Sequence, residues 1–155
     1  MTTLILPTTE ASGAPQRTVE RSKTERSTRV LLVEDEPLTA EVFARALIRD
    51  GHVVDVARDG LQALRRLRER LPSLVVLDMS LPTLSGADVV RELRTAGHRD
   101  LPIVVVSGSD RRDTTLTAAE LWPGAWLCKP IKPRELVAVV RDLTRRHDGS
   151  LPDRE

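Results

Sequence analysis

Short runs of apolar residues recur along the chain, and several of them are uninterrupted and rich in β-branched side chains. The runs are Val30–Val33, Val53–Ala57, Leu74–Leu77, Ile103–Val106 and Ala125–Cys128. Strands that are buried on both faces have this pattern, because neither face meets water. The sequence therefore predicts five short, buried strands of the kind found in a parallel sheet.

Helical patterns lie between and after these runs. Apolar residues at helical spacing predict helices over residues 37–50, 59–71 and 133–146, a helix centred on 89–93 and a more polar helix over 110–121. Parallel neighbouring strands need crossover connections, which helices usually supply. Five alternating strands and helices therefore predict an α/β fold, in which an open parallel sheet carries helices on both faces.

The length of 155 residues suits one domain. We predict this domain over residues 29–146. Residues 1–28 contain Thr, Ser, Pro, Gly and charges of both signs without periodicity, which predicts a flexible N-terminal tail, and residues 147–155 predict a short polar C-terminal tail. Because so short a tail is too small for a helix-turn-helix or a catalytic output domain, we expect a single-domain protein that does not contact nucleic acid directly.

The composition excludes several classes of protein. Lys and Arg number 24 and Asp and Glu number 23, so no overall field attracts nucleic acid or a membrane. Phe43, Trp122 and Trp126 are the only aromatic residues, too few for a base-stacking surface. The single cysteine, Cys128, excludes an intrachain disulfide, and we expect it to be buried and inert. No apolar run exceeds five residues, so we expect a cytoplasmic protein without membrane insertion.

Polar side chains follow four of the five predicted strands. Glu34 and Asp35 follow the first strand, Asp78 the third, Ser107 the fourth and Lys129 the fifth. The carboxyl ends of parallel strands lie at one edge of the sheet, where folds of this class place their binding sites. We therefore expect these side chains to meet at one site.

The carboxylates of Glu34, Asp35 and Asp78 repel one another at such a site. At an effective dielectric constant near 20, like charges about 4 Å apart repel by roughly 4 kcal/mol, so the cluster either raises a carboxyl pKa or binds a cation. Mg²⁺ prefers oxygen ligands, and no His or Cys accompanies these acids to favour zinc. The sequence therefore predicts Mg²⁺ as the cofactor.

Asp78 is the candidate nucleophile, because a carboxylate can form an acyl phosphate. Transfer of a phosphoryl group requires the protein mainly to position it and to neutralise its oxygens. The metal ion, the Lys129 ammonium and the Ser107 hydroxyl can each contact one of these oxygens. The set of residues predicts phosphoryl transfer to Asp78.

Five stretches of the chain, in this order, resemble the receiver domain of bacterial two-component response regulators over residues 29–146. They are Val30–Pro37 (VLLVEDEP), Asp59–Leu64 (DGLQAL), Leu77–Gly86 (LDMSLPTLSG), Val104–Gly108 (VVVSG) and Trp126–Pro130 (WLCKP). The resemblance implies a flavodoxin-like, doubly wound (βα)5 fold with three α/β/α layers. It also implies a switch in signal transduction, not an enzyme with substrate turnover.

The resemblance implies specific roles for the acidic residues. Asp78 accepts a phosphoryl group from a phosphohistidine of a sensor histidine kinase or a phosphotransfer protein. Glu34, Asp35, Asp78 and the backbone carbonyl of Ser80 hold Mg²⁺. The chain would then assist its own phosphorylation and dephosphorylation.

The resemblance also implies how the signal leaves the site. Ser107 contacts the phosphoryl group, Lys129 pairs with it, and the Lys129–Pro130 peptide is cis. Trp126 occupies the position of an aromatic residue whose packing changes with that of the serine. This change remodels the face built by the fourth helix, the fifth strand and the fifth helix, which a downstream protein partner or a second phosphorylated copy binds.

The chain departs from the family pattern at several positions. Leu81 and Ile131 replace Met and Phe, which are tolerable apolar exchanges. Trp126 is larger than the usual Tyr or Phe, and overpacking typically costs about 1–3 kcal/mol, so its movement is an open question. Ser80 and Ser109 are small and neutral, which leaves water a path to the phosphoryl group and predicts a lifetime that is not extremely long.

Two other functions stay open at this point. A Mg²⁺-dependent phosphatase with the same aspartyl chemistry needs a second acid two residues after its nucleophile, where this chain has Ser80. An interaction module that works without phosphorylation would keep the acids unused. Ser107 as a turn residue and Trp126 as core packing are the simpler interpretations of those two residues. The three histidines, His52, His98 and His147, are predicted at the surface.

Overall fold

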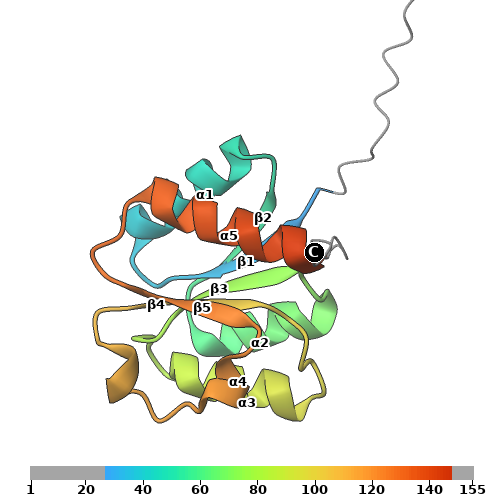
Figure 1. The fold of residues 1–155 in the computed structure, drawn as a ribbon, viewed down its shortest axis with the longest axis vertical. Coiled ribbons are helices and arrows are strands. Elements are labelled where there is room, and N and C mark those ends of the chain that lie inside the picture. Colours follow the sequence, from blue (N-terminus) through green and yellow to red (C-terminus); the bar gives the residue numbers. More distant parts are fainter. Residues whose placement is uncertain (1–26, 148–155) are drawn as a thin grey trace, which may run out of the picture.

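The computed structural model describes residues 27–147, and its strands and helices alternate along the chain (Figure 1). The strands are β1 (Arg29–Val33), β2 (Val53–Ala57), β3 (Leu74–Asp78), β4 (Ile103–Ser107) and β5 (Gly124–Cys128). The helices are α1 (Pro37–Arg49), α2 (Gly60–Glu69), α3 (Gly86–Thr95), α4 (Ala118–Leu121) and α5 (Pro133–His147), with a 3-10 helix at Arg111–Asp113. The predicted tails lie almost entirely outside the described residues.

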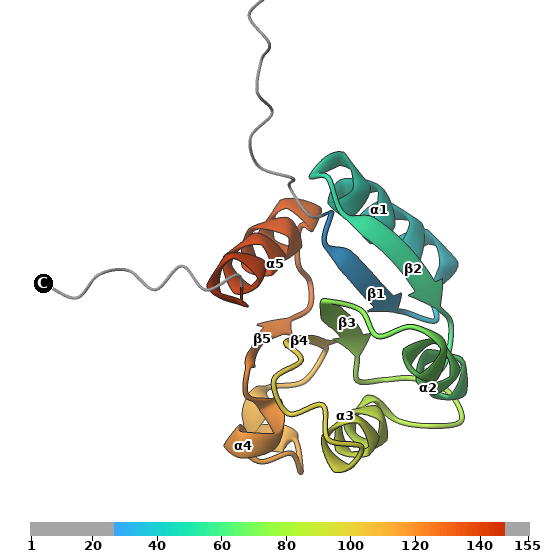
Figure 2. The same cartoon turned by 90° about the vertical axis from the view of Figure 1, so that its right-hand side faces the viewer.

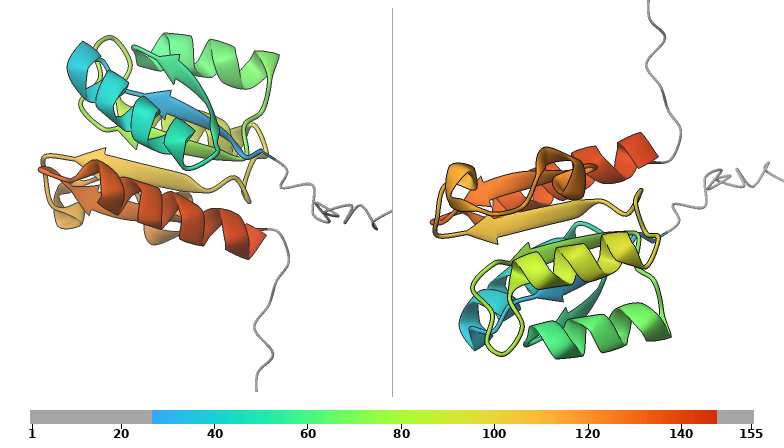
Figure 3. Two further views of the ribbon diagram at one scale, coloured as in Figure 1. Left: turned by 90° about the horizontal axis from the view of Figure 1, so that it is seen from above. Right: turned by 90° about the horizontal axis from the view of Figure 1, so that it is seen from below.

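All five strands lie parallel in one sheet, in the order β2-β1-β3-β4-β5. Helices α1 and α5 cover one face of this sheet, and α2, α3 and α4 cover the other (Figure 2). In the view from above α1 and α5 lie towards the viewer, and in the view from below α2, α3 and α4 do (Figure 3). The predicted flavodoxin-like, doubly wound fold is therefore confirmed.

The buried strands divide their side chains between two cores, because successive residues of a strand point to opposite faces. Leu31 and Val33 of β1 pack towards α2 and α3, whereas Val30 and Leu32 pack towards α1 and α5. The central strands β3 and β4 follow the same alternation and are buried along their whole length. No helix within residues 27–147 has both the length and the apolar character needed to cross a bilayer.

Side-chain caps set where two of the helices begin. Asp59 accepts a hydrogen bond from the Gln62 N–H at 2.7 Å before α2, and Ser85 accepts one from the Asp88 N–H at 3.2 Å before α3. Such caps satisfy N–H groups that have no partner within the helix. The loops that carry the site residues therefore end at defined positions.

The prediction of a helix over residues 110–121 is wrong in its extent. Only Ala118–Leu121 form α4, and the chain before them contains the 3-10 helix and an irregular segment. Thr114 accepts a hydrogen bond from the Leu116 N–H at 3.2 Å, and Thr117 forms a capping box with Glu120. These side chains bind the backbone locally and favour turns and caps over a continuous helix.

Two predictions of burial are also wrong. Cys128 is exposed, because it ends β5 at the edge of the sheet, and its thiol lies 3.7 Å from the Ser109 carbonyl oxygen. The His52 side chain is only 8% exposed, and its Nε2 lies 3.2 Å from Asp50 Oδ2. Its partner Asp50 caps the end of α1, and the contact covers most of the imidazole, although the residue as a whole is half-buried.

Asp50 joins the end of α1 to α5, and its contribution to stability is expected to depend on pH. The hydrogen bond from Arg141 holds the pKa of Asp50 below its ordinary value of 3.8, against the opposing effect of partial burial. A carboxyl group whose pKa is lower in the folded state stabilises the fold above its unfolded pKa, and this contribution is lost as the pH falls. We expect Asp50→Asn to lower the free energy of unfolding by about 1 kcal/mol at neutral pH.

Urea unfolding of wild type and Asp50→Asn at neutral pH and in acid tests this expectation. The difference between the two proteins should shrink as the pH falls below 3.8. Asp142→Asn is a matched control, since Asp142 forms an exposed pair with Arg146 one turn along the same helix α5. A difference that persists unchanged in acid contradicts the assignment.

Candidate functional site

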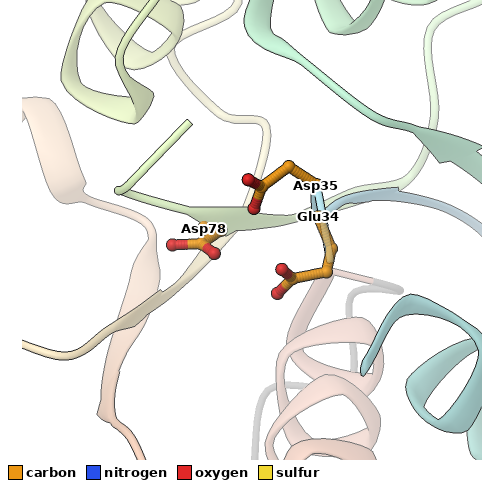
Figure 4. A group of neighbouring side chains, drawn as sticks. All are labelled: Glu34, Asp35 and Asp78. Atoms are coloured by element: carbon orange, nitrogen blue, oxygen red, sulfur yellow. The ribbon is translucent and has the colours of Figure 1, made fainter. Parts of the chain in front are cut away.

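Three carboxylates meet at the carboxyl edge of the sheet (Figure 4). One carboxylate oxygen from each of Glu34, Asp35 and Asp78 lies within 4.8 Å of the other two. Glu34 and Asp78 are 2% and 3% exposed, whereas Asp35 is exposed. The two buried acids come from the ends of the adjacent strands β1 and β3, so the strand order itself brings them together.

Lys129, which follows β5, places its ammonium group against these acids. Its Nζ donates a hydrogen bond to Asp78 Oδ2 at 2.8 Å and lies 3.7 Å from Glu34 Oε2. Partial burial alone would lower the pKa of Lys129, but the hydrogen bond to Asp78 and the charges of Asp78, Glu34 and Asp35 together raise it. Lys129 is therefore held as a cation between two buried carboxylates.

Glu34 is the acid on which burial acts most clearly. Burial raises the pKa of Glu34, the Glu36 N–H bond opposes this effect, and the negative charge of Asp78 adds to it. Lys129 only partly offsets the charge of the cluster, since its ammonium group lowers the Glu34 pKa without reversing the net rise. A second cation at the three carboxylates would be stabilised electrostatically.

Backbone N–H groups orient the two buried carboxylates. The Ser80 N–H donates to Asp78 Oδ1 at 2.9 Å, and the Glu36 N–H donates to Glu34 Oε1 at 3.1 Å. Ser80 itself lies in the exposed turn after β3. Asp78 thus has one oxygen bound by backbone and the other by Lys129, which fixes the plane of its carboxylate.

Ser107, at the end of β4, is 4% exposed and belongs to the same edge. Its hydroxyl accepts a hydrogen bond from the Ser109 N–H at 3.1 Å, and its carbonyl accepts one from the Lys129 N–H at 2.7 Å. Ser107 is therefore connected to Lys129 through the backbone and to the loop that follows β4 through its side chain.

Trp126, on β5, contacts the same loop. Its indole Nε1–H donates to the Ser109 carbonyl at 3.3 Å, and its ring packs partly buried against the core on the α2–α3 side of the sheet. Ser109 thus bonds Ser107 through its N–H and Trp126 through its carbonyl. In the sequence Ser109 is only a small residue beside the site, and nothing around it predicts this connection.

Two glycines that were not predicted as site residues lie against the segment that runs from Asp78 to Leu84. A Cβ atom on Gly86 would lie 2.6 Å from the Asp78 carbonyl oxygen and 2.8 Å from the Met79 Cα. A Cβ atom on Gly60 would lie 2.5 Å from the Leu84 carbonyl oxygen. The signal in the sequence is a glycine directly after each capping residue, at the start of a helix, where no special backbone angle is needed.

Gly86→Ala is expected to displace Asp78 and to destabilise the fold. The two nearest atoms belong to the backbone and cannot swing aside as the Met79 side chain can, and overpacking of this kind costs about 1–3 kcal/mol. Thermal or urea unfolding measures the effect. Gly108→Ala is the control and should leave stability nearly unchanged, because a Cβ atom at Gly108 meets open space and its φ is not positive. An unchanged stability of Gly86→Ala contradicts the predicted close approach.

The residues at this edge fit a hard divalent cation. The three carboxylates supply only oxygen ligands, and two of them are buried with an excess of negative charge. Mg²⁺ prefers oxygen ligands and retains waters, which the exposed side near Asp35 allows. The Lys129–Pro130 peptide is cis, as the resemblance implied, and a second cis peptide, Trp122–Pro123, was not predicted.

The fold and the acidic edge together define the class of protein. The family model described as the response regulator receiver domain matches residues 30–141. The chain therefore belongs to the receiver domains of response regulators, the proteins of two-component signal transduction, and the predicted family is confirmed.

Two curated relatives are response regulators of mycobacteria. The chain is 41% identical over 122 residues to the DNA-binding response regulator MtrA of Mycolicibacterium smegmatis, which covers 77% of this chain and 52% of MtrA. It is 36% identical over 120 residues to the response regulator MprA of Mycobacterium ulcerans, covering 77% of this chain and 51% of MprA. The chain thus spans about half the length of these relatives.

Solved structures of receiver domains have the same fold. The response regulator TrrA of Thermotoga maritima, in complex with Mg²⁺-BeF, has a TM-score of 0.66 and 28% identity, covering 75% of this chain and 98% of TrrA. The receiver domain from Methylobacillus flagellatus has a TM-score of 0.65 and 31% identity, with the same coverage. A CheY-like receiver domain of Methanospirillum hungatei, at 18% identity and a TM-score of 0.71, matches in fold and covers 78% of this chain and 96% of that domain.

Proposed function

We propose that this chain is a phosphoacceptor switch in which Asp78 accepts a phosphoryl group from a phosphohistidine of a sensor histidine kinase or a phosphotransfer protein. The observation that supports this most directly is the Lys129 ammonium, 2.8 Å from a carboxylate that is itself buried beside two other acids. A structural salt bridge needs one carboxylate. Three carboxylates around one ammonium leave an excess of negative charge that attracts a divalent cation, and this cation together with Lys129 would neutralise the oxygens of a phosphoryl group.

Glu34, Asp35, Asp78 and the Ser80 carbonyl are the residues we propose to hold Mg²⁺. When bound, the ion supplies positive charge that neutralises the phosphoryl oxygens. Asp35, as the exposed acid, faces the side from which a hydrated ion enters, whereas Glu34 and Asp78 hold fixed carboxylates at the bottom of the site.

The transfer itself is a displacement at phosphorus. A carboxylate oxygen of Asp78 forms the new bond to phosphorus, the bond from phosphorus to the donor's imidazole nitrogen breaks, and its electron pair stays with the imidazole. Lys129 would exchange part of its contact with Asp78 for a phosphoryl oxygen. Ser107 would rotate its hydroxyl to donate to another oxygen.

Ser109 carries the change away from the site in this proposal. The Ser107 hydroxyl accepts the Ser109 N–H before phosphorylation, and rotation towards the phosphoryl group breaks that bond. The Ser109 carbonyl holds the Trp126 indole, so the loop and the ring are coupled. Trp126 and Ser107 are therefore the proposed switch residues, and the face of α4, β5 and α5 is the proposed surface for a protein partner or a second copy.

The position of Ser80 favours the switch over a phosphatase. Ser80 lies exposed two residues after Asp78, where a phosphatase of this chemistry needs a second acid. An unused site is the other alternative, and the burial of both Glu34 and Asp78 argues against it. Burying two carboxylates beside one ammonium costs free energy that apolar residues at these positions would not cost. DNA binding is named for MtrA; for this chain we propose an output through a protein partner in the cytoplasm.

Incubation with a small acyl phosphate and Mg²⁺ separates these functions. A switch gains a persistent phosphoryl group in its intact mass, and Mg²⁺ chelation prevents this gain. Steady release of inorganic phosphate from many phosphate esters indicates the phosphatase. The module that works without phosphorylation is indicated when the mass does not change, no phosphate is released and a sensor kinase also fails to phosphorylate the chain.

A further inference from the structure

Helix α4 depends on contacts from outside itself. It has four residues, Ala118–Leu121, and its two helical hydrogen bonds run from the Leu121 N–H to Thr117 and from the Trp122 N–H to Ala118. A helix of one turn is not stable alone, because fixing its backbone costs conformational entropy that its few hydrogen bonds do not offset. Its position must therefore be set by neighbouring elements.

Two arginines of α3, one turn apart, supply polar contacts to α4 and the segment before it. The Arg91 Nε lies 3.4 Å from Glu120 Oε1, and its Nη2 donates to the Thr115 hydroxyl at 2.9 Å and the Thr115 carbonyl at 3.3 Å. The Arg94 Nε donates to the Glu120 carbonyl at 2.8 Å. The pair thus holds the side chain and the backbone of the same α4 residue.

The two arginines differ in how firmly they are placed. Arg94 also donates from Nη1 to the carbonyls of His98 at 2.6 Å and Leu101 at 2.9 Å, and its Nη2 is buried without a partner in the described part of the chain. The Arg91 side chain is 42% exposed. Water can replace the Arg91 contacts at little cost, whereas withdrawing Arg94 leaves several buried groups unpaired.

Glu120 connects the Arg91 contacts to the fold of α4. Its Oε2 accepts the Thr117 N–H at 2.7 Å as part of the capping box, while its Oε1 faces Arg91. One carboxylate therefore both caps α4 and attaches it to α3. The loop that precedes α4 begins at Ser109, which is bonded to Ser107 and Trp126, so movement at the phosphoryl site acts on α4 through the chain.

We propose that Arg91 is a positioning residue of the switch: its contacts with Glu120 and Thr115 hold α4 in place in the unphosphorylated protein, and phosphorylation of Asp78 releases them while Arg94 stays bound as the pivot. This inference rests on the proposed function. It adds the regulation of that site, since the strength of the Arg91 contacts sets how readily the switch turns on.

Linkage gives the expected effect on ligand binding. A contact present only in the unphosphorylated arrangement opposes any ligand that favours the other arrangement, and removing the contact tightens binding by the same factor. Exposed charge pairs are worth up to about 1 kcal/mol, which corresponds to about fivefold in an equilibrium constant. Loss of the Arg91 contacts is therefore expected to tighten binding of a phosphoryl mimic by up to about fivefold.

The test measures binding of beryllium fluoride with Mg²⁺, followed by tryptophan fluorescence, in the full chain. Trp122, 70% exposed at the end of α4, and Trp126 on β5 supply the signal. Arg91→Ala should bind more tightly than wild type, by up to about fivefold. Glu120→Gln should shift the same way by less, because glutamine retains the capping box and loses only the charge. Arg65→Ala, which removes an exposed arginine of α2, should bind like wild type.

Hydrogen exchange of the Leu121 and Trp122 amides, without beryllium fluoride, tests the contacts themselves. Both amides should exchange faster in Arg91→Ala than in wild type and Arg65→Ala, by up to about fivefold, because local opening of α4 becomes easier. Unchanged exchange, or unchanged or weaker beryllium fluoride binding in Arg91→Ala, overturns this inference. A wild-type protein that does not respond to beryllium fluoride overturns the proposed function instead, and the exchange rates still decide whether Arg91 holds α4.

Discussion

Asp78→Asn is expected to remove all phosphoryl transfer to this chain. An amide has no anionic oxygen to attack phosphorus, so the step that forms the new bond is lost rather than slowed. Asparagine has nearly the size of aspartate, but its single side-chain oxygen can replace only one of the two oxygens that accept from the Ser80 N–H and from Lys129, so the fold of the variant has to be checked. Intact mass after incubation with an acyl phosphate and Mg²⁺ measures the effect: wild type gains a phosphoryl group and the variant does not.

Asp113→Asn is the control for this experiment. Asp113 is an exposed carboxylate of the 3-10 helix after β4 and lies outside the acidic cluster. This control should be phosphorylated as wild type is, and thermal unfolding should show that Asp78→Asn is folded. The assignment of the acceptor is contradicted if Asp78→Asn is phosphorylated to the wild-type level and the phosphoryl group is found on another residue.

The strands and the acidic edge follow from patterns that are local in the sequence. Val30–Val33 and Ile103–Val106 are continuous apolar runs, and such runs identify buried strands without any knowledge of their neighbours. Once the sheet is parallel, the residue after each strand must lie at the same edge. The meeting of Glu34, Asp78 and Lys129 could therefore be predicted across large separations in sequence.

The extent of α4 depends on competition that a periodic pattern does not reveal. The spacing over residues 110–121 suits a helix, but Thr114 and Thr117 accept hydrogen bonds from the nearby backbone, so the helix begins only at Ala118. Two arginines on α3, Arg91 and Arg94, then determine where the remaining turn lies. Contacts of this kind depend on the distance between two helices, which the sequence of either helix does not contain.

The burial of His52 and the close approach at Gly86 have the same origin. The His52 side chain is mostly covered beside Asp50, which Arg141 of α5 also contacts, and Gly86 is needed because α3 begins against the Asp78 backbone. The sequence around His52 or Gly86 does not distinguish either residue from an ordinary turn residue. Only the assembled structure shows that a Cβ atom at Gly86 would strike the residue proposed to accept the phosphoryl group.

Lys129→Met is expected to slow phosphorylation and, at the same time, to strengthen Mg²⁺ binding. Methionine keeps most of the side-chain stem but removes the ammonium that would contact a phosphoryl oxygen, and loss of one such donor typically slows catalysis by about 10²–10³-fold. The same ammonium is a competitor for the metal, because it lies against both Asp78 and Glu34. It also lowers the pKa of Glu34, so its loss raises that pKa and leaves three acids for which Mg²⁺ is the main counter-charge.

Phosphorylation rates with an acyl phosphate and titration with Mg²⁺ measure the two effects separately. Lys132→Met is the matched control: Lys132 is an exposed lysine three residues further on, and it should leave both quantities unchanged. A variant that merely unfolds loses phosphorylation and metal binding together, whereas loss of a positioned cation moves them in opposite directions. Phosphorylation of Lys129→Met at the wild-type rate contradicts the proposed contact with the phosphoryl group, and weaker Mg²⁺ binding contradicts the proposed competition at the carboxylates.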